Sequence, residues 1–137
     1  MSHLENRRFL GAWELVSFES LRPDGTVTRP WGDDPFGLVL WTDSGHMSAQ
    51  LGPRNQAARP YLAYCGTIEA ADVSEGTLVH RVVGASRPAL LADQVRSFSF
   101  PAEDSLVLSP PAAPDGSQSV LRWRRLIAVQ DRSTLRQ

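Results

Sequence analysis

Residues 36–51, FGLVLWTDSGHMSAQL, decide the fold, because two apolar runs meet there across Asp43-Ser44-Gly45. Gly45 can adopt the left-handed backbone conformation that ends a three-residue hairpin loop. The Val39-Leu40-Trp41 run before it favours a pleated, half-buried surface. The stretch therefore predicts a β-hairpin, with the other strands pairing outward from it.

Turn signals recur on both sides of this hairpin at the spacing of about 8–12 residues that is typical of antiparallel all-β folds. They separate further extended runs at residues 11–21, 26–30, 61–71, 77–83, 94–100, 105–109 and 118–126. No stretch has a convincing helical period, although residues 88–92 can form one helical turn. We expect an all-β fold, a single antiparallel up-and-down β-barrel of 8–10 strands, because closure removes the exposed edges that an open sheet would keep.

One domain accounts for the whole chain, since 137 residues with 42% apolar content suit a single core. We expect an N-terminal arm at residues 1–10, the barrel at 11–126 and a polar tail at 127–137. The connections at 52–60 and 84–92 are long and irregular, which predicts mobile loops with at least one lying over the mouth of a cavity.

Charge and residue usage exclude several classes of function. A formal net charge of −1 provides no field that would attract nucleic acid or an anionic membrane. All 14 basic residues are arginine, so a lysine Schiff base is excluded, and the single cysteine, Cys65, excludes an internal disulfide. The three histidines lack metal-ligand spacing and no phosphate-binding motif occurs, so we expect neither metal nor cofactor. The charged N-terminus lacks an apolar leader, which indicates a soluble cytoplasmic protein, and the sequence is compatible with a homodimer.

The order of the motifs has a further implication. GAWELVSFE, PWGDDPFGLVLWTDSGHMSAQL, YLAYCGTIEA, TLVHRVVGASRPALLADQVRSFSF, LVLSPP and VLRWRRL together resemble the lipocalin-like domain of bacterial and fungal proteins, over residues 10–126. Gly11-x-Trp13 is similar to the lipocalin G-x-W signature, with a stacking partner expected among Arg122, Arg124 and Arg125. The resemblance implies a cupped barrel that holds a small molecule. Barrels of this general shape that act as cyclases or isomerases offer only an analogy.

Strand alternation assigns two candidate catalytic residues to the barrel interior. His80 alternates with Arg81 and shares the parity of Leu78, so we expect it to point inward as a hydrogen-bonded core histidine or as a general acid or base. Arg96 shares the parity of Phe98. A buried arginine requires a partner, which predicts either an ion pair with Glu19 or Asp93 or a clamp for a ligand carboxylate, enolate or carbonyl.

The remaining candidates are ligand-binding residues. The same alternation places Tyr64 inside, and Trp123 shares one face of its strand with Leu121 and Arg125. Trp41 can line the cavity mouth, and Glu19 points inward if Trp13 does. His46 and Gln50 lie on the exposed parity of their strand, and only a polar-lined interior would reverse that assignment.

Three functions fit these residues. The first is a binding module that holds a small hydrophobic molecule with one anionic or carbonyl group. The second is a cofactor-free cyclase or isomerase of small-molecule biosynthesis, in which His80 moves a proton and Arg96 stabilises oxygen charge. The third is a structural barrel filled by its own side chains. The sequence does not decide whether the protein is an enzyme.

Overall fold

Strands β3 (Phe36–Trp41) and β4 (His46–Gly52) form the hairpin that the sequence predicts. They pair antiparallel from Phe36 opposite Gly52 to Trp41 opposite Met47. Gly45 closes the turn with φ 89°, a left-handed value that explains the glycine at this position. The computed structural model describes residues 7–54, 61–72 and 75–129.

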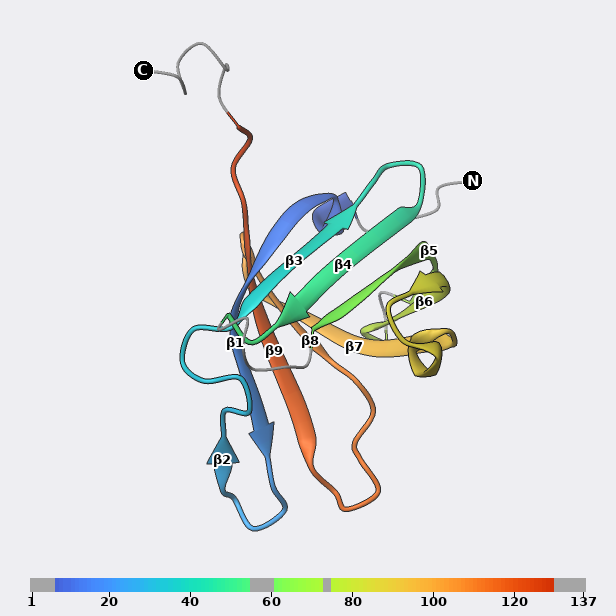
Figure 1. The fold of residues 1–137 in the computed structure, drawn as a ribbon. Helices are drawn as coiled ribbons and strands as arrows, with labels where there is room; N and C mark the ends of the chain where they lie inside the picture. Colours follow the sequence, from blue (N-terminus) through green and yellow to red (C-terminus); the bar gives the residue numbers. More distant parts are fainter. Residues whose placement is uncertain (1–6, 55–60, 73–74, 130–137) are drawn as a thin grey trace.

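The sheet continues from this hairpin by nearest-neighbour antiparallel pairing, and the order is β2-β1-β3-β4-β5-β6-β7-β8-β9 (Figure 1). The other strands are β1 (Gly11–Leu21), β2 (Val27–Thr28), β5 (Leu62–Asp72), β6 (Thr77–Ala85), β7 (Asp93–Ala102), β8 (Ser105–Ser109) and β9 (Gln118–Arg125). A long ladder between β1 and β9 closes the ring. Eight strands therefore make an up-and-down barrel, and β2 pairs with the end of β1 beside it.

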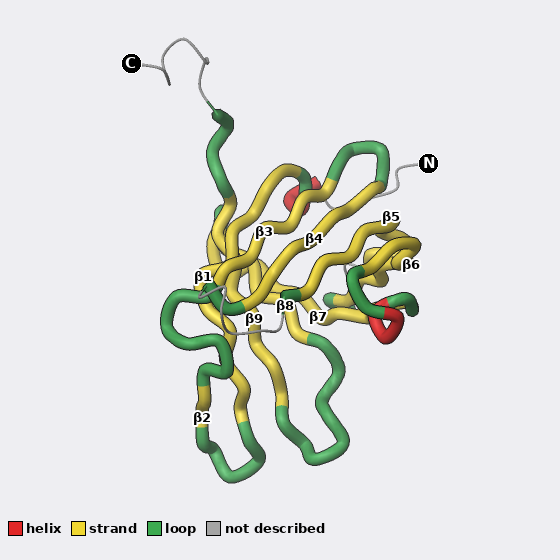
Figure 2. The backbone as a smooth tube through the Cα atoms, in the orientation of Figure 1, coloured by secondary structure: helices red, strands yellow, loops and turns green. Residues whose placement is uncertain are grey.

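Strands make up most of the described chain, as the tube view makes plain (Figure 2). The helical segments among the described residues are two single 3-10 turns, η1 (Arg7–Phe9) and η2 (Pro88–Leu90). η2 lies within the predicted helical turn at 88–92. Residues 55–60, in the first of the two connections predicted to be mobile, lie outside the described residues. The all-β barrel prediction is confirmed.

A β-bulge at Val16 in β1 changes the face on which later residues lie. Before it, Trp13 and Leu15 point into the core, with Leu15 opposite Trp123 on β9. The register then shifts, so that Phe18, opposite Leu121, packs against the core. An extra residue in one strand of a pair reverses the alternation beyond it, and this has consequences for Glu19.

One end of the barrel is closed by the chain that precedes β1. Phe9 is fully buried and makes edge-to-face contacts with Trp41, Phe98 and Phe100. Its carbonyl accepts a hydrogen bond from Trp13 Nε1 at 2.8 Å. Phe9, in the segment predicted as an N-terminal arm, is therefore part of the core. At the other terminus Ile127 is 87% exposed, in the region predicted as a tail.

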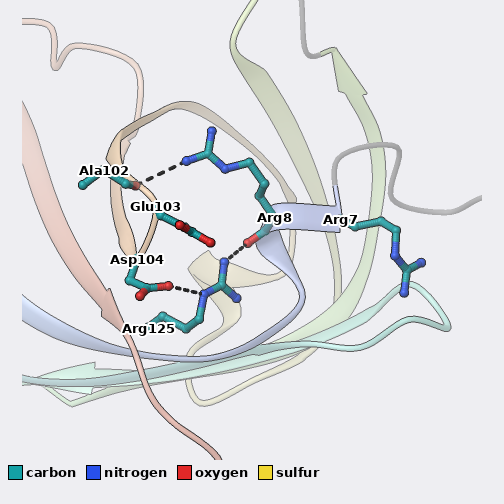
Figure 3. Close-up of a pocket in the computed structure, with 6 residues that line it drawn as sticks. All are labelled: Arg7, Arg8, Ala102, Glu103, Asp104 and Arg125. Carbon is teal, nitrogen blue, oxygen red and sulfur yellow. Dashed lines mark hydrogen bonds and ion pairs between the residues drawn. The ribbon is translucent and has the colours of Figure 1, made fainter.

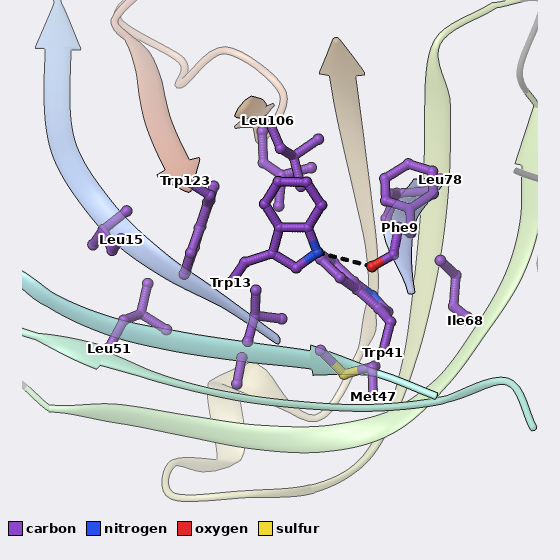
Figure 4. Packing of buried hydrophobic residues seen from close by; sticks show 13 residues of the cluster. Phe9, Trp13, Leu15, Trp41, Met47, Leu51, Ile68, Leu78, Leu106 and Trp123 are labelled. Carbon is purple, nitrogen blue, oxygen red and sulfur yellow. Dashed lines mark hydrogen bonds between the residues drawn. The ribbon is translucent and has the colours of Figure 1, made fainter. Parts of the chain in front are cut away.

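The buried core surrounds Trp13 (Figure 4). Its buried apolar members are Phe9, Trp13, Leu15, Val39, Trp41, Met47, Ala49, Leu51, Ile68, Leu78, Leu106, Leu108 and Trp123. Strands β5 and β6 approach closely at Gly66, where an added Cβ would lie 1.8 Å from the Arg81 carbonyl oxygen. Glycine is required there because any side chain would force the two backbones apart.

Candidate functional site

The inner wall of the barrel has two chemically different parts. The inward residues of β8, β9, β1, β3 and β4 that form the core are apolar, apart from the indole nitrogens of the tryptophans. Strands β5 and β6 contribute Ile68 and Leu78 to the core, but β5, β6 and β7 also carry Tyr64, His80, Gln94 and Arg96. We call these four residues the polar wall. His80 pairs with Gln94 and Leu78 pairs with Arg96, so the members on β6 and β7 are direct or diagonal neighbours. A concave apolar surface with a few converging polar groups is typical of small-molecule sites.

His80 lies in the interior and is only 2% exposed, as the strand alternation predicts. Its Nε2 accepts a hydrogen bond of 3.1 Å from Trp41 Nε1, and the two rings stack with centroids 5.9 Å apart. Trp41 reaches this position from β3, on the far side of β4 and β5. The contact therefore depends on the curvature of the closed barrel.

Burial controls the protonation of His80. Removal from water, together with the positive charge of Arg96, lowers the pKa of His80 from 6.5 to about 3. The ring is therefore neutral near pH 7 and carries one proton. Because the indole N–H of Trp41 can only donate, Nε2 must be the unprotonated acceptor, and the proton lies on Nδ1.

Arg96 extends into the barrel and is half-buried, again as predicted. Its Nη2 donates to Gln94 Oε1 at 3.0 Å and its Nη1 donates to the Val95 carbonyl at 2.9 Å. The predicted ion pairs were wrong: Asp93 pairs with Arg81 and Glu19 pairs with two other arginines. Among the described residues, no carboxylate forms an ion pair with the Arg96 guanidinium.

Tyr64 points inward on β5, opposite Ala49, as predicted. Burial raises the pKa of its hydroxyl, and the charge of Arg96 with a hydrogen bond from its guanidinium acts in the opposite direction. The phenol is therefore protonated at neutral pH. The hydroxyl therefore keeps a proton that it can donate.

Three other predicted candidates lie away from this site. Glu19 was expected inside, but the Val16 bulge turns it outward, where its carboxylate pairs with Arg29 at 3.2 Å and Arg122 at 3.6 Å. His46 is exposed at the start of β4, with Nδ1 2.8 Å from Ser44 Oγ.

Gln50 is exposed as well and accepts a hydrogen bond from Tyr61 Oη on the outer face. The alternation alone had predicted exposure for His46 and Gln50, and it was right. Trp123, the candidate ligand-binding residue on β9, points inward and is buried in the core.

Gln94 is a buried polar residue of this site that was not selected as a candidate from the sequence. It is 7% exposed and holds the Arg96 guanidinium through its side-chain oxygen. The parity that it shares with Arg96 was the available signal. A neutral amide does not stand out in a sequence, so it was not selected.

The last-strand partner of Trp13 is Arg125, whose guanidinium carbon lies 4.3 Å from the ring centroid. Arg125 donates to the Leu10 carbonyl at 2.7 Å and to Asp104 Oδ1 at 3.0 Å, which ties β9 to the chain before β1. Arg125 and Asp104 line a pocket at the closed end of the barrel, together with Arg7, Arg8, Ala102 and Glu103 (Figure 3). The pocket is open to solvent, and both basic and acidic side chains line it. Arg8 donates to the Ala102 carbonyl and Arg125 donates to Asp104 and the Leu10 carbonyl, so these arginines have structural contacts.

No helix of the described residues is long and apolar enough to cross a membrane. Within the same residues, no three histidine, cysteine, aspartate or glutamate side chains gather as metal ligands.

The geometry places this protein in the class of closed up-and-down β-barrels, and one part of its interior is polar. A family model described as a lipocalin-like domain matches residues 10–59, which confirms the predicted resemblance over that part of the chain. No curated protein matches the chain.

Two designed proteins are among the solved structures that resemble it. A redesigned β-barrel has a TM-score of 0.48 and 12% identity, covering 88% of this chain and 93% of its own. A de novo designed fluorescence-activating β-barrel has a TM-score of 0.49 and 17% identity, covering 88% and 95%.

Proposed function

We propose that this protein binds a small hydrophobic molecule with one anionic or carbonyl group, and that this group contacts Arg96. The observation that carries the proposal is the inward, half-buried Arg96 guanidinium, which no described carboxylate neutralises. Withdrawing a charge from water is costly unless an opposite charge or several hydrogen bonds replace the solvent. A ligand oxygen that accepts from the remaining guanidinium N–H groups supplies that compensation.

The neighbours of Arg96 support the same function. Gln94 Oε1 fixes the orientation of the guanidinium, and the Tyr64 hydroxyl lies beside it with a proton to donate. A carboxylate placed here accepts from two side chains at once. The rest of a hydrophobic molecule would lie against apolar side chains beside the core that are only partly buried, such as Leu62 and Phe98.

Catalysis by proton transfer receives less support. A general base works best when its pKa lies near the operating pH. Burial lowers the pKa of His80 to about 3, so the imidazole is a weak base at neutral pH. The reading as a cyclase or isomerase with His80 as the acid or base is therefore the second choice.

The test compares two dyes with the same aromatic skeleton, anilinonaphthalene sulfonate, which is an anion, and phenylnaphthylamine, which is neutral. Fluorescence titration of the wild-type protein should give at least about tenfold tighter binding of the sulfonate, as expected for a charge-assisted hydrogen bond. Arg96→Met keeps the length of the side chain and should abolish this preference. Arg81→Met removes an arginine from the outer face of the adjacent strand and should leave the preference intact.

Equal binding of both dyes, or a sulfonate preference that survives Arg96→Met, would contradict the proposal. If neither dye binds, the barrel is filled by its own side chains. Urea unfolding of each variant provides the check that the fold is retained.

A further inference from the structure

We infer that the ligand carries a second acceptor oxygen, a ketone or similar carbonyl, which accepts a hydrogen bond from Nδ1 of His80. The inference rests on the proposed function, since it describes another part of the molecule whose acidic group contacts Arg96. It begins with the hydrogen-bonding balance of the barrel interior.

Two buried side-chain nitrogens have no hydrogen-bond partner among the described residues, His80 Nδ1 and Trp123 Nε1. Nδ1 of His80 carries the ring proton, because Trp41 occupies Nε2. The indole nitrogen of Trp123 is also a donor. A buried donor without an acceptor is unusual in proteins and costs free energy, so each such group in a native structure calls for an explanation.

Three acceptors of the same interior already receive a hydrogen bond. Trp41 donates to His80 Nε2, Arg96 donates to Gln94 Oε1, and Trp13 donates to the Phe9 carbonyl. The groups of His80 and Arg96 that remain for a ligand are N–H donors. A ligand that matches this wall therefore presents acceptor oxygens.

A ketone matches better than a hydroxyl group. Both can accept from His80 Nδ1, but a hydroxyl brings a proton of its own that needs an acceptor, and the acceptors named above are occupied. Leaving that proton buried and unpaired costs affinity. The discrimination is strong in sites of this kind because an unmatched polar group is penalised more than a missing methylene group.

The ketone and the acid lie at different points of the same molecule. His80 on β6 and Arg96 on β7 are diagonal neighbours, because Arg96 pairs with Leu78 and His80 pairs with Gln94. Diagonal positions on adjacent strands are about 7–8 Å apart. The spacing of the two oxygens along the molecule depends on how far the two side chains extend, and a series of oxo isomers measures it.

The experiment measures displacement of anilinonaphthalene sulfonate by a saturated fatty acid, by its oxo derivatives with the ketone at successive carbons, and by the hydroxy derivative at each carbon. One oxo isomer should bind about fivefold to tenfold tighter than the parent acid, as expected for one added hydrogen bond. The hydroxy acid with the same substitution site should bind more weakly than that oxo acid.

The double variant Trp41→Phe, His80→Leu should reduce the ratio of oxo-acid to parent-acid affinity to about one. Both residues are changed because replacing His80 alone would leave the Trp41 indole N–H without its acceptor. If the double variant does not fold, the imidazole nitrogens of isotope-labelled wild-type protein provide the measurement. The His80 Nδ1–H resonance should then shift with the preferred oxo acid and much less with the parent acid.

Failure of the proposed function and failure of this inference give different experimental results. If the parent acid does not bind in an Arg96-dependent way, the proposed function is wrong and this inference falls with it. If the parent acid binds through Arg96 but no oxo isomer is preferred, or the preference survives in the double variant, only the inference about His80 is overturned.

Discussion

Burial of His80 should make the stability of this protein depend on pH in a window that is set by one residue. The folded-state pKa of His80 is lowered to about 3 by burial and by Arg96, whereas the unfolded chain has the ordinary value of 6.5. Between these values the unfolded state binds a proton that the folded state does not, so the free energy of unfolding falls as the pH falls. Above pH 6.5 neither state is protonated, and His80 makes no pH-dependent contribution.

The size of the effect follows from the same two values. Each pH unit within the window costs about 1.4 kcal/mol. The loss is roughly 5 kcal/mol between pH 6.5 and 3, of which roughly 3 kcal/mol should be visible by pH 4.5. A loss of this size is a large part of the stability of an ordinary domain, which is about 5–15 kcal/mol.

The assay is urea unfolding at a series of pH values between 7.5 and 4, for the wild-type protein and for the double variant Trp41→Phe, His80→Leu. Titration of the carboxylates affects both proteins alike, so the difference between their unfolding free energies isolates His80. This difference should be constant above pH 7 and should change by about 1.4 kcal/mol per pH unit below pH 6. A difference that stays constant over the whole range would refute the reasoning, because His80 would then have a similar pKa in both states.

Two further predictions concern the barrel itself. Gly66→Ala should destabilise the protein by about 1–3 kcal/mol or more in urea unfolding, because the added Cβ would lie 1.8 Å from the Arg81 carbonyl oxygen. The control is Gly84→Ala, whose Cβ meets only a side-chain atom, at 3.4 Å, and which should cost less than about 1 kcal/mol. Equal effects of the two substitutions would contradict the close approach of the strands at Gly66. Arg125→Met should cost about 1–3 kcal/mol through loss of its ring contact and its bonds to backbone carbonyls. Arg124→Met, on the outer face of the same strand, should cost at most about 1 kcal/mol, and the reverse order would show that Arg125 does not hold the closed end.

Much of the fold and part of the site followed from local information. Turn residues and alternating apolar positions marked the nine strands, because both effects act over a few residues of chain. The same alternation placed His80 and Arg96 inside, since their strands are regular from an unambiguous neighbour to the residue in question. Alternation also explains why Arg96 and Asp93 do not form an ion pair. Asp93 lies three residues from Arg96 on the same strand and therefore points to the opposite face.

The remaining features depend on how the strands pair and where the sheet closes. The bulge at Val16 arises from the register between β1 and β9, so the sequence of β1 alone did not indicate that Glu19 would turn outward. The hydrogen bond from Trp41 to His80 joins residues that are 39 positions apart and lie on strands that are not neighbours in the sheet. Alternation is a property of each strand by itself, and it determined which side chains point inward. Which inward side chains meet depends on the curvature and closure of the whole barrel, and only the tertiary structure decided that.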